Sequence, residues 1–180
     1  GKTTTTHMLR SIFLDADKNV GVIGTLGTYL GDEHLPGART TPESTDLYAT
    51  LGLMVEQGIT HVFMEVSSHA LALHRVDGIK FDVAIFTNLT QDHLDWHGDF
   101  EQYAAAKARI FSTNTIAVLN RDDDIVMDMQ SDMDVVRTIT FGVEAPTEED
   151  AFGVFHDTAA GGIDWLVWAE PDAEALELKA

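Results

Sequence analysis

Hydrophobic residues in this 180-residue chain gather in short, continuously apolar runs that alternate with segments of helical periodicity. Continuous runs rich in β-branched residues are typical of strands buried on both faces of a parallel sheet. We expect such strands at residues 20–24, 61–66, 83–88, 116–120 and 135–141. The spacing predicts helices at residues 4–14, 44–57, 100–111 and 123–129. This alternation predicts an α/β fold with a mostly parallel sheet that helices cover on both faces.

Two of the predicted helices carry terminal signals. Gly58 follows the second helix, where a glycine is a plausible C-cap because it accepts left-handed backbone angles. Asp99 precedes the third helix and Gln102 stands three positions later, a spacing that resembles a capping box.

The pattern changes beyond Gly142. Residues 148–150 indicate a loop, and residues 153–158 and 163–168 then predict two strands of a hairpin. A third short strand is expected within residues 176–179. We interpret this region as a small antiparallel extension of the same domain.

The charge balance restricts the possible partners. Eleven Lys and Arg against thirty Asp and Glu give a net charge of −19. This excludes a domain that wraps nucleic acid with a broad basic face, so any phosphate must be held by a local device. Residues 1–120 hold 14 acids and 8 bases (−6), and residues 121–180 hold 16 acids and 3 bases (−13), which we interpret as a solvated acidic surface.

The absence of cysteine excludes disulfides and thiolate metal sites and is consistent with a cytoplasmic protein. No apolar run approaches the ~20 residues of a membrane-spanning helix, so we expect no membrane insertion.

The first three residues, Gly1-Lys2-Thr3, match the second half of a phosphate-binding loop, G-x-x-x-x-G-K-[ST]. In such a loop, backbone N–H groups and a helix N-terminus hold phosphate oxygens, the lysine supplies a charge, and the Thr hydroxyl reaches Mg²⁺. A tripeptide is also compatible with an ordinary helix start.

Glu65 lies at the carboxyl end of the strand predicted at residues 61–66, where open α/β sheets bind ligands. A carboxylate there can hold Mg²⁺ on nucleotide phosphates. The alternative is a strand-end Glu that caps a helix or faces solvent.

The segment of residues 92–97 places His93, Asp95 and His97 at two-residue spacing, just past another strand. Such a loop can ligate a metal, and it can equally be part of an acidic surface.

Lys107 shares one helix face with Phe100, Tyr103 and Ile110. A lysine on an apolar stripe either extends its ammonium to water or is a desolvated amine of lowered pKa, which is a usable nucleophile.

Taken together, these segments resemble the central ATP-binding domain of the Mur ligases of bacterial cell-wall synthesis. The matching stretches are residues 1–6, 24–28, 40–42, 64–71, 86–95, 97–98 and 103–111, with looser matches at 118–120 and 140–142. Within the family, residues 65–71, 86–89 and 92–95 are most similar to the ligase that adds the third peptide residue. That enzyme extends UDP-N-acetylmuramoyl-L-alanyl-D-glutamate by a diamino acid.

The resemblance implies a role for each matching residue. ATP would contact Gly1, Lys2, Thr3, Thr4, Asn88 and Asn120. The resemblance implies Mg²⁺ ligands at Thr3, Glu65, His93 and a carbamylated Lys107. UDP-muramoyl-dipeptide would contact Thr40, Thr41, Ser67 and Arg75. Lys2, His93 and Lys107 are the implied catalytic residues.

The resemblance also implies an ATP-dependent amide-bond ligase of peptidoglycan synthesis that acts through an acyl phosphate. We expect residues 1–180 to be a central-domain fragment that is inactive by itself, with an amino-acid substrate and with N- and C-terminal domains as partners. The alternatives are another Mur-family ligase, an enzyme similar to folylpolyglutamate synthetase, or a non-catalytic nucleotide- or substrate-binding module.

Overall fold

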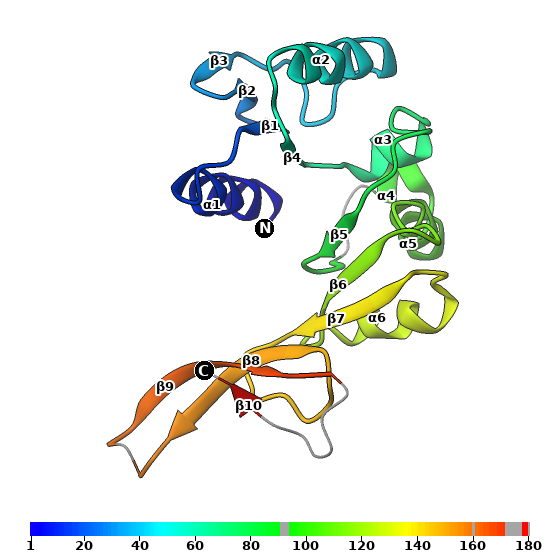
Figure 1. The fold of residues 1–180 in the computed structure, drawn as a ribbon. Coiled ribbons are helices and arrows are strands. Elements are labelled where there is room, and N and C mark those ends of the chain that lie inside the picture. Colours follow the sequence, from blue (N-terminus) through cyan, green and yellow to red (C-terminus); the bar gives the residue numbers. More distant parts are fainter. Residues whose placement is uncertain (91–93, 160, 172–177, 180) are drawn as a thin grey trace. The chain divides into compact units, whose positions relative to one another are not determined.

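The structure of the protein is a computed structural model that describes residues 1–90, 94–159, 161–171 and 178–179. The chain divides into two compact units, which are described separately (Figure 1). The first unit comprises Gly1–Ile79 and His93–Arg109, and the second comprises Lys80–Asp92 and Ile110–Ala180.

The first unit contains a four-stranded sheet in the order β3-β2-β1-β4. Its strands are β1 (Val20–Gly24), β2 (Gly27–Leu30), β3 (Glu33–Leu35) and β4 (His61–Met64). β1 runs parallel to β4, with Val20 opposite His61 and Ile23 opposite Met64. β2 and β3 extend the sheet by antiparallel pairing.

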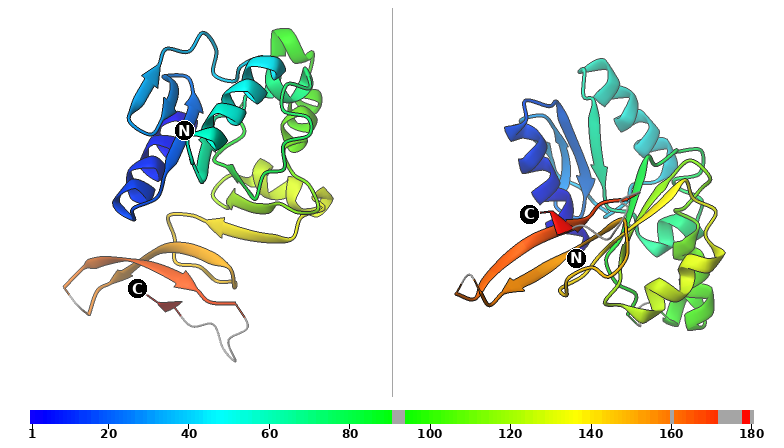
Figure 2. Two further views of the ribbon diagram at one scale, coloured as in Figure 1. Left: turned by 45° about the horizontal axis from the view of Figure 1, so that its top comes forward. Right: turned by 60° about the horizontal axis from the view of Figure 1, so that its bottom comes forward.

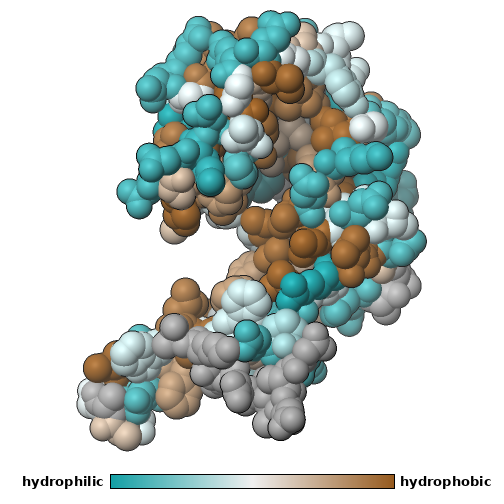
Figure 3. Space-filling model, in the orientation of Figure 1, coloured by the Kyte–Doolittle hydropathy of each residue, from teal (hydrophilic) through white to brown (hydrophobic). Residues whose placement is uncertain are grey.

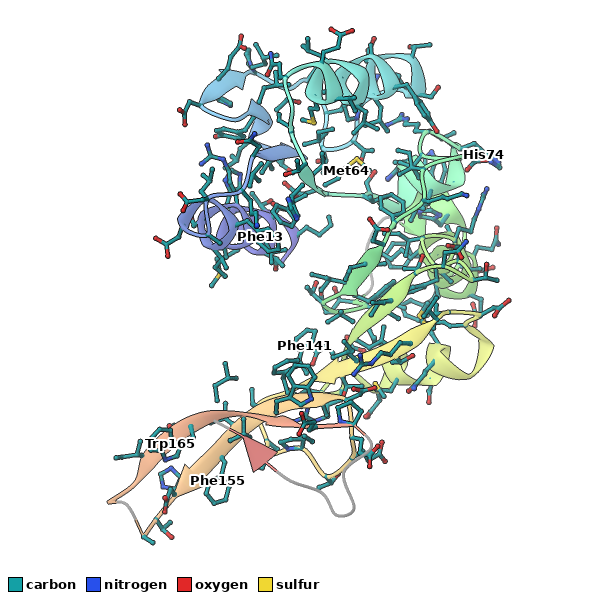
Figure 4. All side chains as sticks on the ribbon, in the orientation of Figure 1. Phe13, Met64, His74, Phe141, Phe155 and Trp165 are labelled. Atoms are coloured by element: carbon teal, nitrogen blue, oxygen red, sulfur yellow. The ribbon has the colours of Figure 1, made fainter. Side chains whose placement is uncertain are left out.

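The described residues of this unit form the helices α1 (Lys2–Asp15), α2 (Ser44–Glu56), α3 (Ser68–Ala72), α4 (Leu94–His97) and α5 (Phe100–Ala108). α1 packs against β1 and β4, as two further views show (Figure 2). Phe13 of α1 lies with its ring centroid 5.0 Å from that of Phe63 and 4.9 Å from that of His61 (Figure 4). Burial of apolar side chains between helix and sheet is the main source of stability in such a layer.

Both predicted helix-terminal signals are confirmed. Gly58 has φ +71°, and the N–H groups of Gly58 and Ile59 donate to the carbonyls of Val55 and Met54, which completes a Schellman motif after α2. Asp99 caps α5 by accepting a hydrogen bond from the Gln102 N–H at 2.8 Å. The Gln102 side-chain amide also donates to the Asp99 carboxylate, at 2.7 Å.

The second unit contains a six-stranded sheet in the order β10-β9-β8-β7-β6-β5. The strands are β5 (Val83–Phe86), β6 (Ile116–Asn120), β7 (Arg137–Phe141), β8 (Ala151–Asp157), β9 (Ile163–Ala169) and β10 (Leu178–Lys179). β5 to β8 pair in parallel, and β8, β9 and β10 pair antiparallel. α6 (Asp124–Asp128) packs on β6 and continues into a short 3₁₀ helix, Met129–Asp132.

Several apolar side chains of this second sheet reach the surface. Val83 and Ile85 alternate along β5 with the buried Ala84 and Phe86, and hydrophobic atoms are visible over this strand (Figure 3). In the hairpin, Phe155 of β8 lies opposite Trp165 of β9, and both are exposed (Figure 4). The alternation along β5 marks one solvated face of that strand, whereas four successive residues of β9, Ile163–Leu166, are exposed.

The α/β fold with its antiparallel C-terminal extension is confirmed, and helices flank mixed sheets. The strands predicted at residues 20–24 and 116–120 have the predicted bounds, whereas the helix expected at 100–111 ends at Ala108. Part of the last predicted strand, residues 176–177, lies outside the described residues. The division of the strands between two sheets was not predicted, because it depends on pairing between distant segments. The β2–β3 hairpin was not predicted because its strands, of four and three residues, are too short to show an alternating pattern.

Candidate functional site

The Gly-Lys-Thr tripeptide begins α1. Gly1 is the N-cap residue, and its carbonyl accepts a hydrogen bond from the Thr5 N–H at 3.1 Å. Lys2 and Thr4 are exposed, and Thr3 is half-buried. The 14-residue helix carries no acidic residue in its first turn to offset the positive partial charge of its N-terminus, so this end favours an anion.

The Thr3 side chain joins this helix start to the carboxylate of Glu65. Its hydroxyl donates to Glu65 Oε2 at 2.8 Å. Glu65 is only 2% exposed and follows β4 directly, with its own N–H donating to the Ile23 carbonyl. Two residues separated by 62 positions therefore meet at the carboxyl end of a parallel strand, as predicted for a ligand site in this class of sheet.

Gly24 and Thr25 complete the surroundings of Glu65. The Thr25 N–H donates to Oε1 at 2.8 Å, and its hydroxyl donates to Oε2 at 3.2 Å. A Cβ on Gly24 would lie 2.9 Å from the Glu65 carboxyl carbon, so the carboxylate can occupy this place only because residue 24 is glycine. This Gly-Thr pair was predicted only as part of a family match, without a role, although its position at the carboxyl end of β1 was the available signal.

These oxygen atoms suit a magnesium ion. A carboxylate and a Thr hydroxyl lie within hydrogen-bond distance beside a helix start, and Mg²⁺ binds through one or two protein oxygens together with phosphates and waters. Among the described residues, no group of three His, Asp or Glu side chains forms a metal cage. The Thr3 hydroxyl and the Glu65 carboxylate beside a helix start fit a metal that shares its coordination with a bound phosphate.

A second group of predicted residues surrounds the segment between β4 and α3. Thr41 is 1% exposed; its hydroxyl donates to the Glu65 carbonyl at 2.9 Å and accepts from the Ser67 N–H at 3.1 Å. Ser67 caps α3 by accepting from the Ala70 N–H at 3.1 Å. Thr41 thus fixes the segment that carries both Glu65 and Ser67.

Arg75 and Thr40 lie close to the same segment. Arg75 donates to the Thr41 carbonyl at 3.3 Å and forms an ion pair with Glu43 at 2.9 Å. Its Nε is buried and has no hydrogen-bond partner in the described part of the chain. The Thr40 hydroxyl lies 3.0 Å from that of Thr25, which connects this group to the Glu65 site.

Lys107 lies on α5, as predicted, and is half-buried. Its Nζ is 4.7 Å from the centroid of the Tyr103 ring, a cation–π contact, and Tyr103 is itself buried. His93, the predicted partner of Lys107 at a metal, lies outside the described residues.

Asn88 and Asn120 belong to the second unit; Asn88 lies two residues after β5, and Asn120 is the last residue of β6. Asn120 Nδ2 donates to the Thr87 carbonyl at 2.9 Å, and the Thr87 hydroxyl donates to Asn88 Oδ1 at 3.3 Å. Asp123 accepts from the Leu89 N–H at 2.8 Å while it caps α6. The loops after these adjacent parallel strands are thereby joined, and Asp123 is a structural contributor that sequence reasoning missed.

Comparison with known proteins identifies the family. The family described as Mur ligase middle domain matches residues 1–166. The chain belongs to the Mur ligase family. The resemblance that the motifs indicated is thus confirmed by a match over most of the chain.

Two similar relatives carry the same name. The UDP-N-acetylmuramoyl-L-alanyl-D-glutamate--2,6-diaminopimelate ligase of Geobacillus thermodenitrificans is 41% identical over 188 residues, which cover 99% of this chain and 38% of that ligase. The ligase of the same name from Caldanaerobacter subterraneus is 44% identical over 144 residues, covering 80% of this chain and 30% of the relative. The chain therefore spans roughly a third of these Mur ligases.

Solved structures support the same fold. A structure of UDP-N-acetylmuramoyl-L-alanyl-D-glutamate--2,6-diaminopimelate ligase superposes with a TM-score of 0.75 at 27% identity and covers 94% of this chain and 35% of that one. E. coli FolC in complex with DHPP and ADP is similar in fold, with a TM-score of 0.56 at 22% identity. In the described part of the chain, every helix is too short or too polar to cross a bilayer.

Proposed function

We propose that this chain is the middle portion of an ATP-dependent ligase that adds a diamino acid to UDP-N-acetylmuramoyl-L-alanyl-D-glutamate. The observation that carries the proposal is the contact between the Thr3 hydroxyl and the buried Glu65 carboxylate beside the start of α1. The names of the relatives, at 41% and 44% identity, supply the substrate class. The chain spans 38% and 30% of those ligases, which supports its assignment as one part of a longer enzyme.

In this proposal the triphosphate binds at the N-terminus of α1. The backbone N–H groups of the first turn, around Gly1, Thr3 and Thr4, would donate to the phosphate oxygens. The exposed Lys2 adds a positive charge. Asn88 and Asn120 are further proposed contacts to the nucleotide. These roles follow the family pattern.

The metal ligands of the proposal are Thr3 and Glu65 at one site and His93 and a carbamylated Lys107 at the other. Bound Mg²⁺ would neutralise charge on the phosphates and on the transferred phosphoryl group. The chain's own contribution is positioning: three hydrogen bonds from Thr3 and Thr25 hold the Glu65 carboxylate in place. A fixed carboxylate reduces the reorganisation needed during the reaction.

The reaction has two steps. A carboxylate oxygen of the D-glutamate residue attacks the γ-phosphorus of ATP, so an acyl phosphate forms and ADP leaves. The neutral amine of the incoming amino acid then attacks the acyl carbon; phosphate leaves, the nitrogen loses a proton, and an amide remains. Positioning and charge neutralisation dominate catalysis in phosphoryl transfer, which agrees with the residue types at this site.

Thr40, Thr41, Ser67 and Arg75 are the proposed contacts to the UDP-muramoyl-dipeptide. The buried Arg75 Nε without a partner in the described chain supports a donor role toward an anionic or carbonyl group. The buried Thr41 hydroxyl already makes two hydrogen bonds, so we assign it to positioning Ser67 as well as to substrate contact.

The remaining parts of the proposal concern the longer enzyme. It has an N-terminal domain that binds the UDP moiety and a C-terminal domain that presents the amino acid, and it acts in the cytoplasm, where ATP is supplied. The 180-residue chain alone forms no amide, because the domain that holds the amine places it beside the acyl phosphate. Holding two reactants in position lowers the activation barrier by ~7–11 kcal/mol in favourable cases.

The test is a substrate panel on the complete polypeptide that carries this chain. We expect phosphate release only when ATP, UDP-N-acetylmuramoyl-L-alanyl-D-glutamate and a diamino acid are all present. Parallel reactions contain dihydropteroate with glutamate, or the UDP-muramoyl acceptors of other ligation steps. Turnover with one of those acceptors and none with the dipeptide would contradict the proposal.

A further inference from the structure

His97 lies in the interior of the first unit beside a serine. It is 7% exposed, and its Nε2 lies 3.0 Å from the Oγ of Ser68, which is 3% exposed. Rings surround the imidazole on several sides: those of His69, Trp96 and Tyr103 have centroids 5.5, 4.5 and 5.2 Å from it. A buried imidazole is costly unless a polar partner satisfies it, and Ser68 is such a partner.

Ser68 of this pair is connected to the Glu65 site. Ser68 is the first residue of α3 and follows Ser67, the N-cap. The Thr41 hydroxyl connects the Ser67 N–H to the Glu65 carbonyl. The position of α3 is therefore tied to the proposed first metal ligand through hydrogen bonds that are buried or partly buried.

His97, the other residue of the pair, is connected to Lys107 through Tyr103. His97 is the last residue of α4, and Gly98, with φ +91°, turns the chain so that Asp99 can cap α5. Tyr103 of α5 contacts the His97 ring, and its own ring carries the Lys107 ammonium at 4.7 Å. Two helices that are distant in sequence, α3 and α5, thus meet at His97.

We infer that His97 is a positioning residue that couples α3 to α5, so that the elements carrying Glu65 and Lys107 keep a fixed geometry. The inference rests on the proposed function for its consequence in catalysis, and on the His97–Ser68 contact for its structural content. An apolar side chain would be sufficient for packing among the rings. The polar pair adds a directional contact that specifies one arrangement of the two helices.

The experiment uses variants that remove the hydrogen bond from either side. His97→Leu keeps much of the volume without the polar atom, Ser68→Ala removes the hydroxyl, and His97→Gln places an amide nitrogen near the former Nε2. His156→Leu is the matched control, because His156 is an exposed histidine of the second unit paired with Asp164.

The first readout is amide hydrogen exchange of the complete polypeptide, which requires no activity. We expect His97→Leu and Ser68→Ala to raise the exchange rates of both α3 and α5 by about 10-fold or more, with α1 and α2 unchanged. The double variant should show no more than the larger single effect, because both changes remove one shared interaction. His97→Gln should restore most of the protection.

The second readout is the Mg²⁺ concentration that gives half-maximal ligase activity. Loss of groups that orient metal ligands commonly costs about 10- to 100-fold, and we expect His97→Leu to fall in this range while His156→Leu matches the wild type. Faster exchange confined to residues 94–99, or additive effects of Ser68→Ala and His97→Leu, would overturn the coupling. Because exchange is measured without turnover, a failure of the coupling is distinguishable from a failure of the proposed ligase activity.

Discussion

Replacement of Gly24 by alanine tests whether the buried Glu65 carboxylate has the place that the structure gives it. The added Cβ would lie 2.9 Å from the Glu65 carboxyl carbon and 3.1 Å from its Cγ, with Oε1 closer still. Glu65 is 2% exposed and is held by Thr3 and Thr25, so its carboxylate cannot move away without losing hydrogen bonds. The substitution therefore acts on the site through a single methyl group.

The expected cost follows from two contributions. Overpacking of a buried position costs ~1–3 kcal/mol. Loss of one hydrogen bond to a charged group adds ~1.5–3 kcal/mol. For a chain of this size, roughly 2–4 °C of melting temperature corresponds to each kcal/mol, so we expect a decrease of about 5–20 °C.

The assay is thermal unfolding followed by circular dichroism, with Gly52→Ala as the matched control. Gly52 lies inside α2, and a Cβ there meets no atom within 4 Å, so alanine should stabilise the helix by ~0.5–1 kcal/mol. In the Gly24→Ala background, Glu65→Asp shortens the side chain by one methylene and should recover part of the loss. A Gly24→Ala variant with the same melting temperature as the wild type would refute the described packing of Glu65.

Three further predictions concern other parts of the chain. Lys107→Ala in the complete ligase should lower kcat by about 100-fold or more and leave the melting temperature within a few degrees of wild type. A small carboxylate should partly restore the activity. Undiminished turnover would contradict the proposed role of Lys107 as a metal ligand. The pKa of Asp99 lies below its ordinary value of 3.8 because the backbone N–H and side-chain amide of Gln102 donate to the carboxylate. The ionised cap therefore stabilises α5 at pH values above 3.8. Asp99→Ala should have a lower melting temperature than the wild type at pH 7, and the difference should vanish as the pH falls below 3.8. Leu119→Ala, at a fully buried position of β6, should lower the free energy of unfolding in urea by ~2–5 kcal/mol. Leu166 is 70% exposed on β9, and Leu166→Ala should change the same free energy by less than ~0.5 kcal/mol.

The parts of the fold that the sequence predicted are those with strong local signals. Residues 20–24 and 116–120 are continuous apolar runs between polar residues, and both strands have the predicted bounds. The Gly58 and Asp99 signals are local backbone requirements, so they could be identified without knowledge of the fold. Glu65 could be predicted as a site residue because it directly follows a strand.

The elements that escaped prediction are short. α3 and α4 have five and four residues, too few for a helical period to be visible in the sequence. β2 and β3 form only by antiparallel pairing next to β1, where Gly27 at φ +111° makes the turn.

His97 illustrates the same limit at the level of one side chain. The segment of residues 92–97 suggested either a metal loop or an acidic surface, and neither alternative included a buried histidine paired with Ser68. Only the approach of α3 and α5 creates that environment, and no local pattern encodes it.

The measurement that tests the central claim most directly follows oxygen atoms through the reaction of the complete polypeptide. UDP-N-acetylmuramoyl-L-alanyl-D-glutamate labelled with ¹⁸O in the reacting glutamate carboxylate is incubated with ATP, Mg²⁺ and a diamino acid, and the released phosphate is analysed by mass spectrometry. An acyl phosphate places one carboxylate oxygen in the phosphate, so we expect one ¹⁸O atom per phosphate released, and none released by the Glu65→Ala variant. Unlabelled phosphate accompanied by amide product would contradict the proposed reaction at this site.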